Sequence, residues 1–154
     1  MNTGVAKSEK TSGGALDPRI VTQCKRNLLD IKGLHRTQFV SATRGEFVCR
    51  GVPGSDCGNN MGNVHGGFLL TLADQAATCA AETHGHDNVT MTVSANFLRP
   101  ARVDDAYIEV RARTVHAGRR SIVVQVEEYR PSGELVLQAT YTQAAFDTLV
   151  VDRA

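Results

Sequence analysis

The feature that most constrains the fold is the stretch from Asn59 to Ala81. A polar loop runs through His65, Gly66 and Gly67 into a segment that is apolar on nearly every side of a helical wheel. A helix that is hydrophobic all round is expected to be buried. Asp74 stands in its middle, where an unpaired carboxylate loses roughly several kcal/mol of solvation. We therefore predict a functional role for Asp74.

The size and charge of the chain exclude several classes of protein. Its 154 residues make about one domain. A formal net charge of +1, with no long run of either sign, does not indicate a nucleic-acid-binding or anionic-membrane surface. No apolar segment approaches the roughly 18 residues that span a bilayer, and residues 1–15 lack the apolar centre of a secretory signal. We expect a cytoplasmic protein.

The cysteines show neither the spacing of a zinc site nor the density of a disulfide scaffold. We therefore expect free thiols and no metal. Cys57 and His65 are of the types that form a nucleophile and its base, but their sequence separation says nothing about geometry. The four cysteines are Cys24, Cys49, Cys57 and Cys79.

The N-terminal part of the chain predicts a tail, a helix and a hairpin. Residues 1–16 have the small polar composition of a disordered tail. Asp17-Pro18 has the pattern of a helix start, and a helix ending at Gly33 is expected from apolar residues at helical spacing. Short β-type runs between 35 and 52 flank a hairpin turn at Arg44-Gly45. The central helix is expected from about Val64 to about 84–85.

After the central helix the apolar period becomes two, which is typical of strands with one buried face. The first strand has Val89, Met91, Val93, Ala95 and Phe97 on that face. Three more strands are expected at about 105–116, 120–130 and 134–146, and the short turns between them favour antiparallel pairing. Their inward residues are predicted to be Ala106, Ile108, Val110 and Ala112; Ile122, Val124 and Val126; and Leu135, Leu137, Ala139 and Tyr141.

These elements predict an α+β layer in which five or six antiparallel strands cover one long helix. A single sheet cannot enclose that helix on every side. The remaining apolar face therefore requires a second subunit, and we expect a homodimer or a higher oligomer.

From about residue 17 to 147 the chain resembles the hotdog-fold acyl-CoA thioesterases, in particular the phenylacetate-type and thioesterase superfamily member 2-like branch. The resemblance implies a hotdog domain over 17–147 and a C-terminal tail over 148–154. It also implies a curved antiparallel sheet around the central helix, and active sites at the interface of a dimer or tetramer. The matching residues are Asn59-x-x-Gly62-x-x-His65-Gly66-Gly67, then Leu72-Ala73-Asp74, then Asn96-Phe97-Leu98-Arg99-Pro100.

The resemblance assigns roles to the central stretch. It implies that Asp74 is the catalytic carboxylate, as general base on water or as nucleophile on the thioester carbonyl; both routes are open. The backbone N–H of Gly66, at the helix N-terminus, would polarise the carbonyl, an effect worth up to about 3 kcal/mol per donor. Asn59 would orient water or the carbonyl across the subunit boundary, and His65 would be a supporting hydrogen-bonder.

Further residues complete the implied site. Thr78, one helical turn after Asp74, and Thr90, which aligns with a hydroxyl-bearing residue of the family, are two candidates for positioning water. Coenzyme A carries phosphates, and arginine pairs with phosphate through its fork of donors. Arg99, Arg119 and Arg120 are candidates for that contact, Gly67 allows close approach of substrate, and Phe68, Leu69, Ala76 and Ala77 are candidates for the acyl pocket wall.

The resulting hypothesis is hydrolysis of an acyl-CoA, with coenzyme A entering as part of the substrate and no separate cofactor. One alternative is a thioester hydratase or dehydratase, but the His-x-x-x-x-Phe-Pro-Gly loop and Asp-x-x-x-x-His arrangement of those relatives are missing here. Another is a non-catalytic acyl-CoA-binding hotdog module, whose mark would be loss of the acid, and Asp74 and Asn59 are both present.

Overall fold

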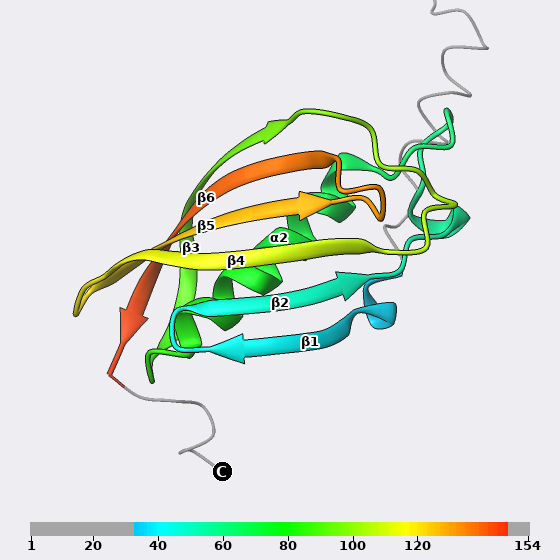
Figure 1. The fold of residues 1–154 in the computed structure, drawn as a ribbon. Coiled ribbons are helices and arrows are strands. Elements are labelled where there is room, and N and C mark those ends of the chain that lie inside the picture. The colour runs from blue at the N-terminus through cyan, green and yellow to red at the C-terminus, as the bar shows by residue number, and fades with distance from the viewer. Residues whose placement is uncertain (1–32, 148–154) are drawn as a thin grey trace, which may run out of the picture.

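The computed structural model describes residues 33–147 (Figure 1). The tails predicted at 1–16 and 148–154 and the helix predicted from Asp17 lie outside the described residues. The elements in chain order are η1 (Leu34–Arg36), β1 (Gln38–Thr43), β2 (Glu46–Gly51), η2 (Ser55–Cys57), α2 (Gly66–Glu82), β3 (Asp87–Phe97), β4 (Ile108–Ala117), β5 (Ser121–Tyr129) and β6 (Leu135–Phe146).

The six strands form one antiparallel sheet in the order β1-β2-β4-β5-β6-β3. The sheet curves, and α2 lies against its concave side (Figure 1). The predicted fold, a curved antiparallel sheet around a long central helix, is confirmed. The hairpin turn at Arg44-Gly45 is confirmed too, since it joins β1 to β2.

The core lies between α2 and the inner face of the sheet. The predicted inward residues of β5 are buried, as are those of β6 from Leu137 on: Ile122, Val124, Val126, Leu137, Ala139 and Tyr141. Leu135 was predicted inward but is only half-buried, because the register against β5 shifts there and Val136 is buried in its place. The strand predicted from 105 begins only at Ile108. The Asp105 carboxylate accepts the Arg102 backbone N–H and three hydrogen bonds from Arg130, which holds residues 102–106 in a turn and leaves Ala106 exposed.

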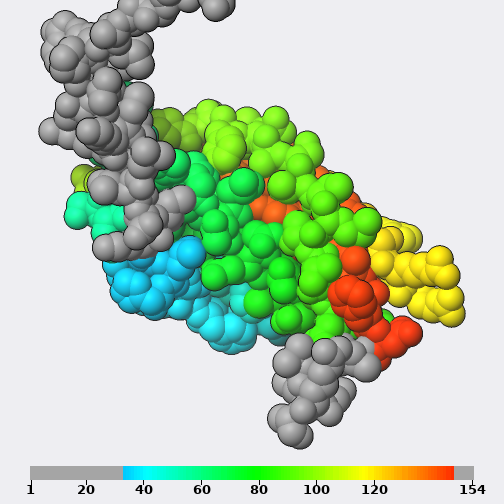
Figure 2. Space-filling model, turned by 180° about the vertical axis from the view of Figure 1, so that it is seen from behind, coloured from blue at the N-terminus to red at the C-terminus, as the bar shows by residue number. Residues whose placement is uncertain are grey.

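The central helix is two residues shorter at each end than predicted. Val64 bonds instead to the Ala101 carbonyl, and Thr83 closes the helix, its hydroxyl bonding to the Ala80 carbonyl. The expectation of burial on every side is wrong for the single chain. Thr71 and Gln75 are exposed and Asp74 is half-buried, because the sheet covers one side of α2 and leaves the other at the surface (Figure 2).

The strand β3 also departs from the prediction. It is an edge strand, and Val89, Met91, Val93 and Phe97 are 43% to 61% exposed. The register against β6 shifts between Thr90 and Thr92, so Met91 is an extra residue at a β-bulge. The bulge breaks the strict alternation. Val89 therefore lies on the outer face, and Thr90 joins Val93, Ala95 and Phe97 on the face toward the helix.

Candidate active site

Asp74 and Thr90 form the centre of the candidate site. The Thr90 hydroxyl donates to Oδ1 of Asp74 at 2.6 Å, across sixteen residues of sequence. This length is typical of a hydroxyl bound to an ionised carboxylate. Of the two threonines predicted to act beside Asp74, the structure brings Thr90 to it. Thr78, half-buried on the next helical turn, has no recorded hydrogen bond to the carboxylate.

The bulge at Met91 is the local cause of this contact. Thr90 pairs with Gln143 of β6, and Thr92 pairs with the next residue, Thr142. Gln143 is fully buried, so its partner Thr90 lies on the helix side of the sheet. Without the extra residue, strand alternation would turn Thr90 to the outer face with Thr92. The bulge therefore directs the hydroxyl toward Asp74.

The turn of α2 that carries Asp74 is fixed to the sheet by Tyr141. This side chain is buried, and its hydroxyl donates to the carbonyl oxygen of Leu70 at 2.8 Å. In an α-helix the same carbonyl accepts the N–H four residues on, which is that of Asp74. Burial, followed by the charge of Asp74, raises the pKa of Tyr141 above its ordinary value, so the phenol remains a donor.

The helix N-terminus presents a free donor at Gly66. His65 is the N-cap, and its Nδ1 accepts the Gly67 N–H at 3.1 Å, while the Phe68 N–H donates to the His65 carbonyl. Among the described residues, none accepts the N–H of Gly66. In this chain His65 caps the helix, and a supporting contact with the thioester stays a prediction for it.

Gly66 lies against the aromatic ring of Phe97. A Cβ added at Gly66 would stand 3.3 Å from Cε1 of Phe97, closer than side chains ordinarily pack. Gly66 and Asp74 are eight residues apart on one helix, which places them about 12 Å apart along its axis. Within a single chain, the Gly66 N–H and the Asp74 carboxylate are therefore too far apart to contact the same carbonyl group.

Asn59 serves its own loop in the single chain. Its side-chain oxygen accepts the backbone N–H groups of Met61 at 2.9 Å and Asn63 at 3.2 Å. This leaves the amide nitrogen to donate elsewhere. A polar contact across a subunit boundary stays a prediction for this residue.

The three candidate arginines do not converge in one chain. Arg99 follows the C-terminal end of β3. Arg119 and Arg120 come just before Ser121, which pairs with Ala144 of β6, and Ala144 pairs with Val89 near the start of β3. The two groups therefore lie at opposite ends of β3. All three side chains are exposed. Phe68, a candidate wall residue, is fully buried in the core.

Cys57 and His65 form no catalytic pair. Cys57 is buried, its Sγ bonds to the backbone of Gly54, and burial raises the pKa of its thiol, while His65 Nδ1 is used by the helix cap. Cys49, Cys57 and Cys79 are free thiols, and Cys24 lies outside the described residues. Across 33–147, no cluster of three or more His, Cys, Asp or Glu is arranged to hold a metal ion.

Two buried polar residues escaped the sequence analysis, although a signal was present. Extending the period of two from Val126 and Tyr141 by one step gives Glu128 and Gln143, polar residues at inward positions. Both are fully buried, and neither polar end has a hydrogen-bond partner among the described residues. Burial raises the pKa of the Glu128 carboxyl well above its ordinary value and so favours its neutral form.

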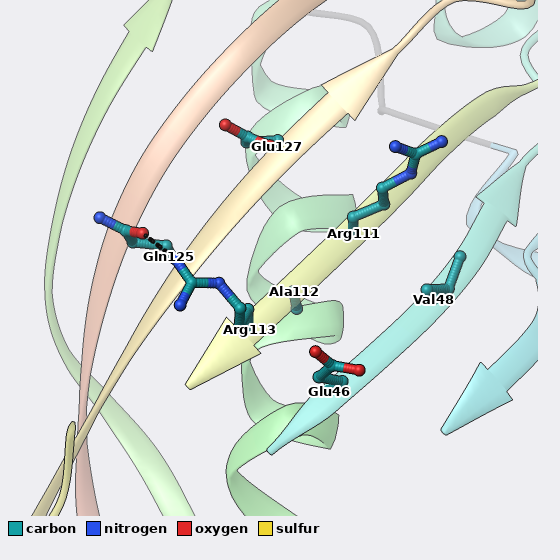
Figure 3. Close-up of a pocket in the computed structure, with 7 residues that line it drawn as sticks. All are labelled: Glu46, Val48, Arg111, Ala112, Arg113, Gln125 and Glu127. Atoms are coloured by element: carbon teal, nitrogen blue, oxygen red, sulfur yellow. Dashed lines mark hydrogen bonds between the residues drawn. The ribbon is translucent and has the colours of Figure 1, made fainter. Parts of the chain in front are cut away.

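A surface pocket of about 280 Å³ lies away from this site (Figure 3). Apart from the buried Ala112, its side chains stand on the face of β2, β4 and β5 that is turned from the helix, and Arg113 donates to Gln125 at 3.0 Å within it. Two acidic and two arginine side chains balance in charge there: Glu46, Glu127, Arg111 and Arg113. We assign it no role in the chemistry of Asp74.

Comparison with known proteins decides the family. The profile of the Thioesterase superfamily matches residues 61–137, half of the chain, and spans the His65–Gly67 loop, Asp74 and Thr90. The chain belongs to the thioesterase superfamily. The predicted family and enzyme class, a hotdog-fold thioesterase, are thereby confirmed. None of the helices in the described part of the chain is long and apolar enough to cross a membrane.

Relatives in this superfamily have been solved with ligands. A hypothetical thioesterase from Streptococcus pneumoniae, solved with coenzyme A, is 30% identical, with 75% of this chain and 92% of that chain covered and a TM-score of 0.71. Two variants of that protein have also been solved. One replaces an aspartate by alanine, and the other replaces by alanine a threonine that lies sixteen residues after that aspartate. A Streptococcus mutans protein bound to acetyl-CoA is 28% identical, covering 77% and 95%, with a TM-score of 0.71.

Among characterised sequences, human acyl-coenzyme A thioesterase 13 is 24% identical over 113 residues. The match covers 71% of this chain and 80% of the human protein.

Proposed function

We propose that this thioesterase hydrolyses acyl-coenzyme A to a free acid and coenzyme A, with Asp74 as the catalytic carboxylate. The observation that carries the proposal is the hydrogen bond from Thr90 to Asp74. Its two residues are sixteen positions apart, as are the aspartate and threonine substituted in the pneumococcal relative, a protein solved with coenzyme A. The acetyl-CoA complex of the second relative supports the same substrate class.

The geometry of the carboxylate suits two routes. Thr90 occupies Oδ1, and no described residue donates to Oδ2. Oδ2 takes a proton from water while the water oxygen attacks the thioester carbonyl carbon, or it attacks that carbon itself and water then cleaves the resulting anhydride. In both routes the C–S bond breaks with its electron pair on sulfur, and the thiolate leaves as coenzyme A. No cofactor besides the substrate's own coenzyme A takes part.

The thioester site is shared between two copies of the chain. A reacting carbonyl has to lie about 3 Å from the Gly66 N–H and a similar distance from the attacking oxygen. Because these groups are about 12 Å apart on one helix, one chain does not supply both. Two antiparallel copies of α2 would place Gly66 of one copy beside Asp74 of its partner.

The exposed side of β3 supports this pairing. Val93 and Phe97 lie on the same inner face as Thr90 and are 43% and 54% exposed. Natural proteins cover or blunt exposed edge strands, and twofold dimers are the commonest homo-oligomers. A second copy against β3 and the open side of α2 would cover both. Arg99 or the Arg119-Arg120 pair would meet the coenzyme A phosphates from one copy or the other.

The test is release of free thiol from a panel of aromatic and fatty acyl-CoAs by the full-length protein and by Asp74→Asn. Hydrolysis by the wild type and its loss in Asp74→Asn are expected. Wild-type release no faster than that of the variant across the panel refutes the proposal. Binding without turnover favours an acyl-CoA-binding module, and hydration of an enoyl thioester without thiol release favours a hydratase.

A further inference from the structure

Gln143 is a buried amide with no hydrogen-bond partner in the described part of the chain. Its exposed fraction is zero, and both Nε2 and Oε1 are shielded from solvent without a donor or acceptor in reach. An amide in that condition destabilises the fold relative to an apolar side chain of the same size. Orphaned polar groups in a native interior call for an explanation other than packing.

The position of Gln143 relates it to the Asp74 site. It stands opposite Ile122 of β5 on one side and opposite Thr90 of β3 on the other. Residues opposite one another in antiparallel strands share a face, with Cβ atoms about 5 Å apart. Because Ile122 is fully buried, this row faces α2. The amide is therefore the immediate inner neighbour of the hydroxyl that binds Asp74.

The hydrogen-bonding capacity of Thr90 leaves room for this neighbour. Its hydroxyl proton is directed to Asp74 Oδ1, but the oxygen keeps two lone pairs. The Nε2 of Gln143 is a donor that matches them. The Asp74 carboxylate is an acceptor, so a water molecule that is held by the Gln143 amide and donates to Thr90 Oγ1 would keep the Thr90 proton directed toward Asp74.

We propose that Gln143 is a positioning residue for the Asp74 site. Its amide donates through one water molecule to Thr90 Oγ1, so that Gln143, the water, Thr90 and Asp74 form one chain of hydrogen bonds. This inference rests on the proposed function for its effect on catalysis. The hydrogen-bond chain itself does not depend on which thioester is hydrolysed.

The kinetic test uses Gln143→Leu with Gln138→Leu as the matched control. Gln138 lies on the same strand but is exposed on the outer face. Gln143→Leu is expected to lower kcat about tenfold, which corresponds to the loss of one hydrogen bond at the upper end of the ordinary range. KM should stay unchanged, and Tm should stay unchanged or rise. Gln138→Leu is expected to change none of these. Unchanged kcat in Gln143→Leu overturns the proposal.

A double-mutant cycle separates positioning from packing. With Thr90→Val already in place, adding Gln143→Leu is expected to lower kcat no further, because both changes break the same chain. Multiplicative losses mean that Gln143 acts independently of Thr90 and contradict the proposal. Gln143→Met, which fills the site without an amide, should match Gln143→Leu.

A readout without substrate distinguishes failure of this inference from failure of the proposed function. The side-chain NH₂ resonances of Gln143 in the isotope-labelled full-length protein are expected to shift in Thr90→Val and in Asp74→Asn. If they shift while the wild type releases no thiol from any acyl-CoA, the hydrogen-bond chain stands and the proposed function fails. If they stay in place in both variants, the chain is absent whatever the activity.

Discussion

Thr90→Val removes the hydroxyl that binds Asp74 and keeps the shape of the side chain. The bond lost is 2.6 Å long and ends on a carboxylate, and bonds to charged groups are worth about 1.5–3 kcal/mol. If that stabilisation is realised in the transition state, kcat falls by about tenfold to 150-fold. Because Thr90 is exposed in the chain, we expect the free energy of unfolding to change by no more than about 0.5 kcal/mol.

The bulge at Met91 provides the control for this prediction. Thr92 has the same side chain two residues along the strand, but on the outer face. Steady-state thiol release should therefore show a large loss of kcat in Thr90→Val and none in Thr92→Val, with similar melting temperatures. Equal rates in the two variants would refute the assignment of Thr90 to the site.

Three further predictions address other parts of the account. Gly66→Pro removes the free N–H, and proline is acceptable at the first helical position, so this variant should lose most of its thiol release. Gly66→Ala keeps the N–H but presses on Phe97 and should retain more activity. Equal losses in the two variants would argue against a role of the N–H. Tyr141→Phe should cost about 1 kcal/mol and lower Tm by about 2–4 °C in thermal unfolding, and an unchanged Tm would contradict the anchoring of α2 through Leu70. Glu128→Leu should raise the free energy of unfolding at pH 7, because burial raises the pKa of Glu128 in the folded protein while its carboxyl in the unfolded chain ionises above about pH 4.5. Denaturant titrations should show that this gain in stability shrinks as the pH falls toward 4.5. A gain that is independent of pH would contradict the effect of burial on this carboxyl.

The sequence predicted most of the fold because the inner faces of β5 and β6 follow a strict period. Ile122, Val124 and Val126 are apolar at every second position and are buried, so the period placed them on the inner face. The helix was predicted for a similar reason. Its ends were not, because His65 at the N-cap is an unusual capping residue and its contact with Gly67 is visible only in three dimensions.

The candidate site was predicted in its residues but not in its geometry. A β-bulge inserts one residue into a strand without any mark in the sequence. The alternation around Met91 was therefore interpreted as one continuous inner face, and the choice between Thr78 and Thr90 stayed open. The register with β6 settles which of them contacts Asp74. Gln143 was missed because only the apolar residues of the period were assigned to the inner face, and these stop at Tyr141, although the strand was predicted to continue to 146.

The most direct test of the shared site is subunit complementation between two inactive variants. Asp74→Asn and Gly66→Pro each damage both sites of a homodimer. In a mixed dimer, one site joins the intact Gly66 of the first variant to the intact Asp74 of the second. Random reassociation of equal amounts makes half of the dimers mixed, so about a quarter of wild-type thiol release should return. If the mixture releases no more thiol than the separate variants, Gly66 and Asp74 do not act across two copies.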